Sequence, residues 1–376
     1  MRAVHGVLRG VVAGGIAKHP GRPWRNDSSG NGPPTSASCA HDGDRVGRFN
    51  PQLAAANPSR PRNVFKNLLL AIAATLVALL LGEGAVRAAI YFLHREPIVA
   101  SDRHAGWKGR PHLNAVEVVV AGMRFRVSTD ELGRRVLREP ADTIAAPTVV
   151  LVGDSYTFGL GVSDSETFQW FLSKQMPNRR FVNLGVPGWG TDQELVNLDD
   201  FLNANRGRII SDTVVLVTEN DFSDVQRTFD TYLGRRKPIF HAGPGGLETG
   251  AFRLNFVDRL MDHSRLTWLV RSKLASLYRL VQIDPAGGEE VVVASLVGIR
   301  RLGESRGARL HLFAFRRTRT KSAVSDRTWS SFLNRSGALD MTDSIRVGSG
   351  GDPFALDGHW SAEGNRRAAR VIRGAL

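Results

Sequence analysis

The sequence has a single cysteine, Cys39, in 376 residues. An intramolecular disulfide needs two cysteines, so a disulfide framework and a zinc site built from several thiolates are both excluded. The ten histidines are scattered along the chain, and none repeats at the spacing of metal ligands. We therefore expect no metal ion in this protein.

Lysine is also scarce. Seven of the 50 basic residues are lysines and the rest are arginines, and with 36 acidic residues the net charge is +14. Such a basic surface favours anionic partners, which include nucleic acid, anionic lipid and acidic polysaccharide. The sequence contains no zinc finger, no RNA-binding signature and no compact run of lysine and arginine, so nucleic acid is not expected among them.

The N-terminal segment, residues 1–62, lacks apolar periodicity and is rich in glycine, proline, serine, asparagine and arginine. A segment of this composition cannot bury enough surface to offset its ordering entropy, so it is predicted to be disordered. A start codon assigned too far upstream is an alternative explanation. The remaining length allows one large or two modest domains.

A long apolar segment follows. The charge-free run from Leu68 to Gly82 would span about 22 Å as a helix, which is short for a bilayer, but apolar residues resume after Glu83 and continue to Leu93. Glu83 and Arg87 lie four residues apart and can pair on one helical face. The segment lacks the polar face of a globular surface helix. The simplest prediction is one tilted transmembrane helix over 63–93.

The orientation of this helix follows from its flanks. Arg60, Arg62 and Lys66 precede it, so the N-terminal segment is expected in the cytoplasm and everything after residue 95 outside it. A cleaved signal peptide is the alternative, with the same basic residues as its charged region. No clean small-x-small cleavage site follows directly, which favours an uncleaved signal anchor.

Beyond the anchor, residues 95–147 form a lead-in with a candidate hairpin, and 148–376 alternate short apolar runs with helical segments. This alternation predicts an α/β domain with a mainly parallel sheet, whose ligand sites lie off the carboxyl ends of the strands. A polar insertion, 222–257, is expected to shape the substrate groove by its position. The predicted hairpin strands are 116–120 and 123–127; the sheet strands are 148–153, 180–185, 213–218 and 309–315; the helices are 166–175, 192–205, 257–283, 288–304 and 361–375.

Four blocks near the ends of these strands carry candidate chemistry. Ser155 stands between a buried strand and a helix, where a hydroxyl nucleophile can be held. Gly188 follows the second strand and frees a backbone N–H to approach a ligand. Asn220 follows the third strand and offers an amide donor to an oxyanion. His359 can act as a base, with Asp357 fixing its tautomer.

In this order the blocks, Gly-Asp-Ser-Tyr, Gly-Val-Pro-Gly, Glu-Asn-Asp and Asp-Gly-His-Trp, resemble those of the SGNH/GDSL hydrolase family, over roughly 148–372. The resemblance implies a three-layer sandwich and catalysis without a cofactor. It implies Ser155 as nucleophile, His359 as general base and Asp357 as its partner. The oxyanion hole would comprise the backbone N–H groups of Ser155 and Gly188 and the side-chain amide of Asn220.

The lead-in adds to the likeness. The segments 104–107, His-Ala-Gly-Trp, and 132–135, Leu-Gly-Arg-Arg, resemble those of membrane-anchored bacterial members of the family, which are often associated with modifying cell-envelope or exported polysaccharides.

The sequence also departs from the family pattern. Thr218 stands where the third block usually has glycine. The last block reads Asp-x-His rather than Asp-x-x-His, which leaves Asp352 as a weaker alternative partner for the histidine. Thr157 replaces the second glycine of a Gly-x-Ser-x-Gly elbow, which argues against an ordinary α/β-hydrolase.

These features predict a serine esterase that cleaves O-acyl esters, O-acetyl being one example, of an exported or cell-envelope glycan through an acyl-enzyme on Ser155. An O-acyltransferase or lipid esterase of the same fold, and a non-catalytic membrane-tethered glycan-binding or assembly protein, remain alternatives. Trp189 and Trp360 flank the site blocks and either line a sugar site or fill the core. The sequence does not predict the oligomeric state.

Overall fold

A computed structural model describes residues 61–137, 146–230, 232–243, 246–277, 285–317, 324–347 and 351–376. The predicted disorder of residues 1–62 falls almost wholly outside these residues. By their internal contacts the described residues divide into two units, one that ends at residue 79 and one that begins at residue 80 and runs to residue 376.

A single long helix, α2 (Pro61–Phe92), occupies the predicted anchor segment. From Asn63 to Phe92 it is long and apolar enough to cross a membrane, and its most apolar stretch is not buried by the rest of the protein. The predicted ion pair is present, with 2.7 Å between Arg87 Nε and Glu83 Oε1. A helix over the predicted segment 63–93 is therefore confirmed, and its crossing of a membrane stays a prediction.

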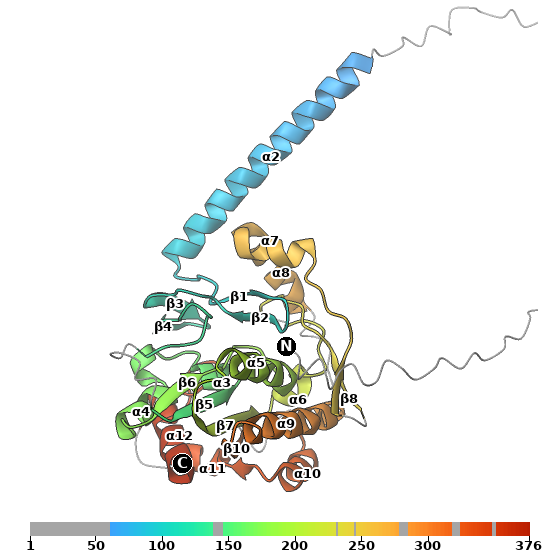
Figure 1. The fold of residues 1–376 in the computed structure, drawn as a ribbon. Coiled ribbons are helices and arrows are strands. Elements are labelled where there is room, and N and C mark those ends of the chain that lie inside the picture. The colour runs from blue at the N-terminus through green and yellow to red at the C-terminus, as the bar shows by residue number, and fades with distance from the viewer. Residues whose placement is uncertain are drawn as a thin grey trace, which may run out of the picture. The chain divides into compact units, whose positions relative to one another are not determined.

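The larger unit is built on a five-stranded sheet in the order β11-β10-β7-β5-β6, and every neighbouring pair is parallel (Figure 1). The predicted α/β class with a mainly parallel sheet is thus confirmed. The strand β11 has two residues, too short for an apolar pattern to reveal. The strands are β5 (Thr148–Gly153), β6 (Arg180–Asn183), β7 (Ile210–Thr218), β10 (Arg309–Phe315) and β11 (Leu339–Asp340).

Helices cover both faces of the sheet, because successive side chains of a strand point to opposite sides. Val150 and Val152 of β5 pack with one group of helices, whereas Val149 and Leu151 pack with the other. The first face is covered by α5 (Thr191–Ala204), α9 (Glu289–Glu304) and α10 (Asp326–Ser336). The second is covered by α4 (Phe168–Gln175), α11 (Thr342–Arg346) and α12 (Ala362–Ala375). The layers form the predicted three-layer sandwich.

Other helices lie at the strand ends or in the connections: α3 (Ser155–Phe158), α6 (Asp221–Asp224), α7 (Phe256–His263), α8 (Arg265–Leu277) and the 3₁₀ turns η1 (Asp164–Glu166) and η3 (Pro285–Gly288). The single helix predicted over 257–283 is wrong. Ser264, in extended conformation, separates α7 from α8, and residues 278–283 lie outside the described part of the chain.

The lead-in forms two antiparallel pairs, β1 (Val99–Asp102) with β2 (Gly106–Gly109) and β3 (Val116–Val120) with β4 (Met123–Val127). The second is the predicted hairpin. Its turn places Ala121 and Gly122 at φ values of 48° and 85°, as a type I′ turn requires. A third pair lies inside the insertion, between β8 (Phe240–Gly243) and β9 (Gly246–Thr249).

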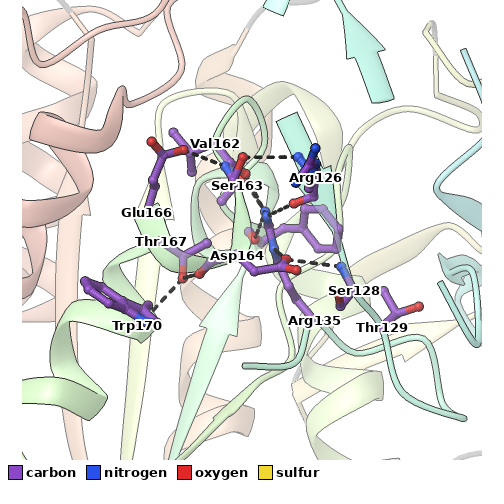
Figure 2. A network of polar contacts seen from close by, with 12 residues as sticks. Arg126, Ser128, Thr129, Arg135, Val162, Ser163, Asp164, Glu166, Thr167 and Trp170 are labelled. Atoms are coloured by element: carbon purple, nitrogen blue, oxygen red, sulfur yellow. Dashed lines mark hydrogen bonds and ion pairs between the residues drawn. The ribbon is translucent and has the colours of Figure 1, made fainter. Parts of the chain in front are cut away.

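A buried arginine of the segment 132–135, Arg135, helps to join the lead-in to the sheet domain. Its guanidinium donates to the backbone carbonyls of Phe158, Gly159, Val162 and Arg126 and to the Asp164 carboxylate, so all five N–H groups are used (Figure 2). Since Phe158 and Gly159 end the short helix that begins at Ser155, Arg135 fixes the segment behind the candidate nucleophile.

Candidate active site

The strand-to-helix turn at Ser155 is sterically constrained. A Cβ on Gly153 would lie 2.1 Å from Thr157 Oγ1 and 3.1 Å from the Leu216 carbonyl oxygen, so only glycine fits there. The Asp154 carboxylate caps α3 by accepting the Tyr156 N–H at 2.9 Å. These contacts hold Ser155 at the carboxyl end of β5. The residue is 7 % exposed.

The structure brings Ser155, His359 and Asp357 into one hydrogen-bonded row. Ser155 Oγ lies 2.8 Å from His359 Nε2, and His359 Nδ1 lies 2.7 Å from Asp357 Oδ2. The backbone N–H of His359 also donates to Asp357 Oδ1 at 3.0 Å. A carboxylate at Nδ1 favours the tautomer with its proton on Nδ1, which leaves Nε2 free to accept the serine proton.

Asp357 carries the negative charge that orienting His359 requires. Partial burial raises the pKa of its carboxyl, but the hydrogen bond and charge of His359 outweigh burial and hold the pKa below its ordinary range. The carboxyl is therefore ionised at neutral pH. Asp352, the alternative partner, instead accepts the Phe354 N–H at 2.9 Å. The Asp-x-His spacing brings Asp357 itself to the ring.

Two tryptophans that flank the site blocks are core residues. Trp189 and Trp360 are each 1 % exposed. Trp189 donates its indole N–H to the Trp107 carbonyl at 3.0 Å, and Trp360 packs edge-on against Tyr156 and Phe315. The interpretation of these residues as walls for a sugar ring is wrong, because neither presents a face to solvent.

The proposed oxyanion donors lie on loops that converge on α3. The loop after β6 packs against the serine turn, since a Cβ on Gly185 would come within 2.4 Å of the Phe158 nitrogen. Gly188 has φ +80°, which favours glycine, and its added Cβ would lie 2.6 Å from Asp230 Oδ2. Asp230 belongs to the 222–257 insertion, which therefore packs against the loop that carries Gly188.

Asn220 is held differently from the expectation. Its amide nitrogen donates to Asp154 Oδ2 and to Asp224 Oδ2, both at 2.9 Å, while Thr218 Oγ1 lies 2.7 Å from its carbonyl oxygen. Both amide hydrogens therefore have carboxylate acceptors. For the amide to donate to an oxyanion, one of those carboxylates must release it. Thr218, where the family pattern has glycine, contributes a hydroxyl to this network.

A group of buried carboxyls behind Asn220 escaped sequence analysis. Asp192, Glu194, Asp221 and Asp224 are all less than a tenth exposed. Burial raises the pKa of Asp224 to about 7, although Arg227 opposes the shift. Asp192 also has a raised pKa through burial, and Lys237 Nζ lies 2.7 Å from its Oδ2. All four residues occupy the first turns of helices, two in α5 and two in α6, where acidic residues are expected as exposed capping groups, and this masked their burial.

Glu194 is the most isolated of these carboxyls. It is 1 % exposed, and within the described residues neither of its carboxyl oxygens has a hydrogen-bond partner. Burial, together with the nearby charges of Asp221, Asp154 and Asp192, raises its pKa well above the ordinary value of 4.5. Folding therefore disfavours the ionised form of Glu194.

This raised pKa predicts a pH-dependent effect of Glu194→Gln. In the unfolded chain Glu194 ionises near 4.5, whereas the folded protein keeps the proton to higher pH. The folded state then binds more protons, so the unfolding free energy falls as pH rises, by at most about 1.4 kcal/mol per pH unit for this group. A glutamine side chain does not titrate, so the variant does not lose stability in this way as pH rises. The Tm of the variant minus that of the wild type should increase as pH is raised above 4.5, whereas a difference that stays constant with pH would show that folding does not raise the pKa of Glu194.

No cluster of three or more His, Cys, Asp or Glu side chains in the described ranges is arranged to hold a metal ion. Three of the carboxyls behind Asn220 have partners: Asp192 accepts from Lys237, Asp224 from Arg227 and Asn220, and Asp221 from the backbone N–H of Thr218. These hydrogen bonds hold the loop that carries Asn220.

Comparison with known proteins gives a distant likeness only. No family model and no curated protein matches the chain. Among solved structures, TesA is 14 % identical over 61 % of this chain and 97 % of its own, with a TM-score of 0.36. A G-D-S-L family lipolytic protein from Veillonella parvula is 13 % identical over 61 % of this chain and 98 % of its own, and esterase EstA from Pseudoalteromonas sp. is 11 % identical over the same shares; both have TM-scores of 0.33.

These descriptions name the kind of protein that the four sequence blocks resemble, namely G-D-S-L lipolytic hydrolases and esterases. At such identities and TM-scores the likeness does not assign an activity to this chain. The geometry of its own side chains is what supports one.

Proposed function

We propose that this protein is a serine-dependent carboxylic ester hydrolase with Ser155 as its nucleophile. The observation that carries the proposal is the row Ser155–His359–Asp357, with distances of 2.8 and 2.7 Å. A serine activated by a base, with a third group orienting that base, is the arrangement needed for covalent acyl transfer.

The reaction follows from these contacts. His359 Nε2 takes the hydroxyl proton as Ser155 Oγ attacks the ester carbonyl, and the tetrahedral intermediate carries its negative charge on the former carbonyl oxygen. Collapse expels the alcohol, which receives the proton from His359, and leaves an acyl group on Ser155. Water then attacks the acyl-enzyme by the same route and regenerates the serine.

The backbone N–H groups of Ser155 and Gly188 would stabilise the oxyanion. In the described residues no backbone hydrogen bond of a turn, loop or cap uses either N–H, in keeping with this role. One such donor typically contributes about 3 kcal/mol to transition-state binding. Asn220 would join them after Asp224 releases its amide. Since the pKa of Asp224 is raised to about 7, its protonation can weaken that competing hydrogen bond near neutral pH.

We further propose that the substrate is an O-acyl ester, such as an O-acetyl ester, of an exported or cell-envelope glycan. Helix α2 is long and apolar enough to anchor the chain in a membrane, and Arg60, Arg62 and Lys66 before its apolar run favour an orientation with the hydrolase domain outside the cytoplasm. Residues 95–376 carry 39 basic and 32 acidic side chains, and their net charge of +7 favours attraction of an anionic polymer.

Bacterial spheroplasts that carry the full chain test substrate and orientation together. A polysaccharide cannot cross the membrane, so acetate release from an added O-acetylated polysaccharide requires an outward-facing site. We expect release without lysis and none from the Ser155→Ala chain.

Three other outcomes would each contradict one part of the proposal. Release only after detergent lysis would contradict the orientation. Hydrolysis of a small ester or lysophospholipid without release from the polysaccharide would contradict the glycan substrate. If the detergent-lysed spheroplasts hydrolysed none of these esters, a non-catalytic role would be favoured.

A further inference from the structure

Helix α8 presents an apolar stripe to solvent. Val270, Leu274 and Leu277 are 49 %, 57 % and 63 % exposed, and the part-buried Leu266 lies one turn before them. These positions, spaced by four, four and three residues, share one face of the helix. Phe256 in the preceding helix α7 is 76 % exposed. A soluble surface helix usually places polar residues at such positions, so this stripe marks an interaction surface.

The stripe borders a groove between α7, α8 and the insertion. The groove has a volume of about 500 Å³ and is lined mainly by apolar residues: Val257 of α7, Leu266, Val270, Leu274 and Ala275 of α8, and Phe229. Its apolar lining extends the exposed stripe across both helices.

The end of the anchor helix holds the start of α8. The Glu83 carboxylate accepts hydrogen bonds from Ser264 Oγ at 2.8 Å and from the backbone N–H groups of Arg265 at 2.9 Å and Leu266 at 3.0 Å. It thus caps a helix that lies about 180 residues away in sequence. Arg87 in addition donates to the His263 carbonyl at the end of α7. Glu83 directly follows the charge-free run 68–82, so α8 begins where that run ends.

The charges around the stripe have one sign. Within 251–277 the exposed charged side chains are Arg253, Arg259 and Lys273. The two acidic residues of this stretch are engaged by arginines: Asp258 by Arg236 and Arg271, Asp262 by Arg235. A helix surface with an apolar stripe and cationic borders fits the interface of a bilayer that contains anionic lipid.

We propose that α7 and α8 form an interfacial element that inserts its apolar stripe, Val270, Leu274, Leu277 and Phe256, into the lipid leaflet at the end of α2. This inference rests on the proposed membrane anchoring. Lys273 and Arg259 reach the phosphates of anionic lipid headgroups, while the long stems of such side chains can lie along the apolar surface.

The same element touches the loop over the candidate oxyanion hole. Arg271 of α8 donates from Nε to the Gly234 carbonyl at 3.0 Å, and the backbone carbonyl of Asp230, four residues earlier in that loop, accepts the Gly234 N–H at 2.9 Å. Asp230 is the carboxylate beside Gly188. A bilayer that holds α8 therefore also fixes the loop that borders the site.

Single-cysteine labelling of the full chain tests the inference. Because Cys39 is the only native cysteine, a Cys39→Ser background accepts Val270→Cys or Leu274→Cys, each labelled with an environment-sensitive fluorophore. Vesicles of phosphatidylcholine and phosphatidylglycerol would carry lipid-attached nitroxide quenchers. Val347→Cys is the matched control, because Val347 is 76 % exposed and follows α11, which lies on the side of the domain opposite α7 and α8 (Figure 1).

We expect the labels at 270 and 274 to lose roughly half or more of their emission to the quenchers and to shift to shorter wavelength, as groups buried in the headgroup and acyl boundary do. The label at 347 should change little. A fourth label, at Leu76→Cys in α2, tests the anchor separately.

The outcomes distinguish the interfacial element from the membrane anchor. Quenching at 76 without quenching at 270 and 274 would overturn the interfacial element and leave the anchor intact. Absence of quenching at all three positions would overturn both. Energy transfer between labels at 274 on different chains, without quenching by lipid, would show that a second copy covers the stripe and would also overturn the inference.

Discussion

Ser155→Ala is expected to lower kcat for hydrolysis of p-nitrophenyl acetate by roughly a thousandfold or more, because it removes the hydroxyl oxygen that lies 2.8 Å from His359 Nε2. Without that oxygen no acyl-enzyme forms, and only water attack within the site remains. Since alanine fits any site that serine occupies, the fold should persist, and the Tm of the purified full chain should be nearly unchanged.

The control for this variant is Ser165→Ala, which removes an exposed hydroxyl ten residues away in η1. Its kcat should equal that of the wild type. Equal rates for the wild type and Ser155→Ala would show that hydrolysis occurs elsewhere or by another mechanism.

Asp357→Asn is expected to lower kcat by about 10³- to 10⁴-fold while leaving the shape of the site intact. The carboxylate of Asp357 lies 2.7 Å from His359 Nδ1 and accepts the backbone N–H of the same residue at 3.0 Å. An asparagine can turn its amide nitrogen toward the ring and stabilise the tautomer with the proton on Nε2. That ring cannot accept the serine proton.

Asp352→Asn is the matched control, since Asp352 lies in the same loop but accepts only the Phe354 N–H through its side chain in the described structure. Its kcat should stay within a few-fold of the wild type. A larger loss in Asp352→Asn than in Asp357→Asn would mean that the working enzyme uses the Asp-x-x-His type of partner after all.

Most of the sheet could be predicted from sequence because its strands are buried on both faces. The runs at 148–153 and 213–218 are continuous and β-branched, and they lie on adjacent strands in the structure. The short strand β11 and the helices α10 and α11 were missed, because two residues of strand give no period and the tryptophan and phenylalanine of α10 stand among polar residues.

The site was predictable in its residues but only partly in its contacts. Motif order and spacing brought Ser155, His359 and Asp357 to attention, and the structure joins them. The two carboxylate acceptors of the Asn220 amide depend on the side chains of Asp154 and Asp224 meeting in space, and no local pattern encodes that meeting. The cap that Glu83 supplies to α8 links segments about 180 residues apart, so a local sequence pattern could not predict it either.

The most direct measurement of the central claim is covalent labelling of the full chain with a fluorophosphonate probe, which reacts with a serine activated by a neighbouring base. We expect the wild type to be labelled at Ser155, Ser155→Ala to remain unlabelled, and Asp357→Asn to be labelled far more slowly. Labelling of Ser155→Ala at the wild-type rate, or failure of the folded wild type to react at all, would contradict the assignment of Ser155 as a base-activated nucleophile.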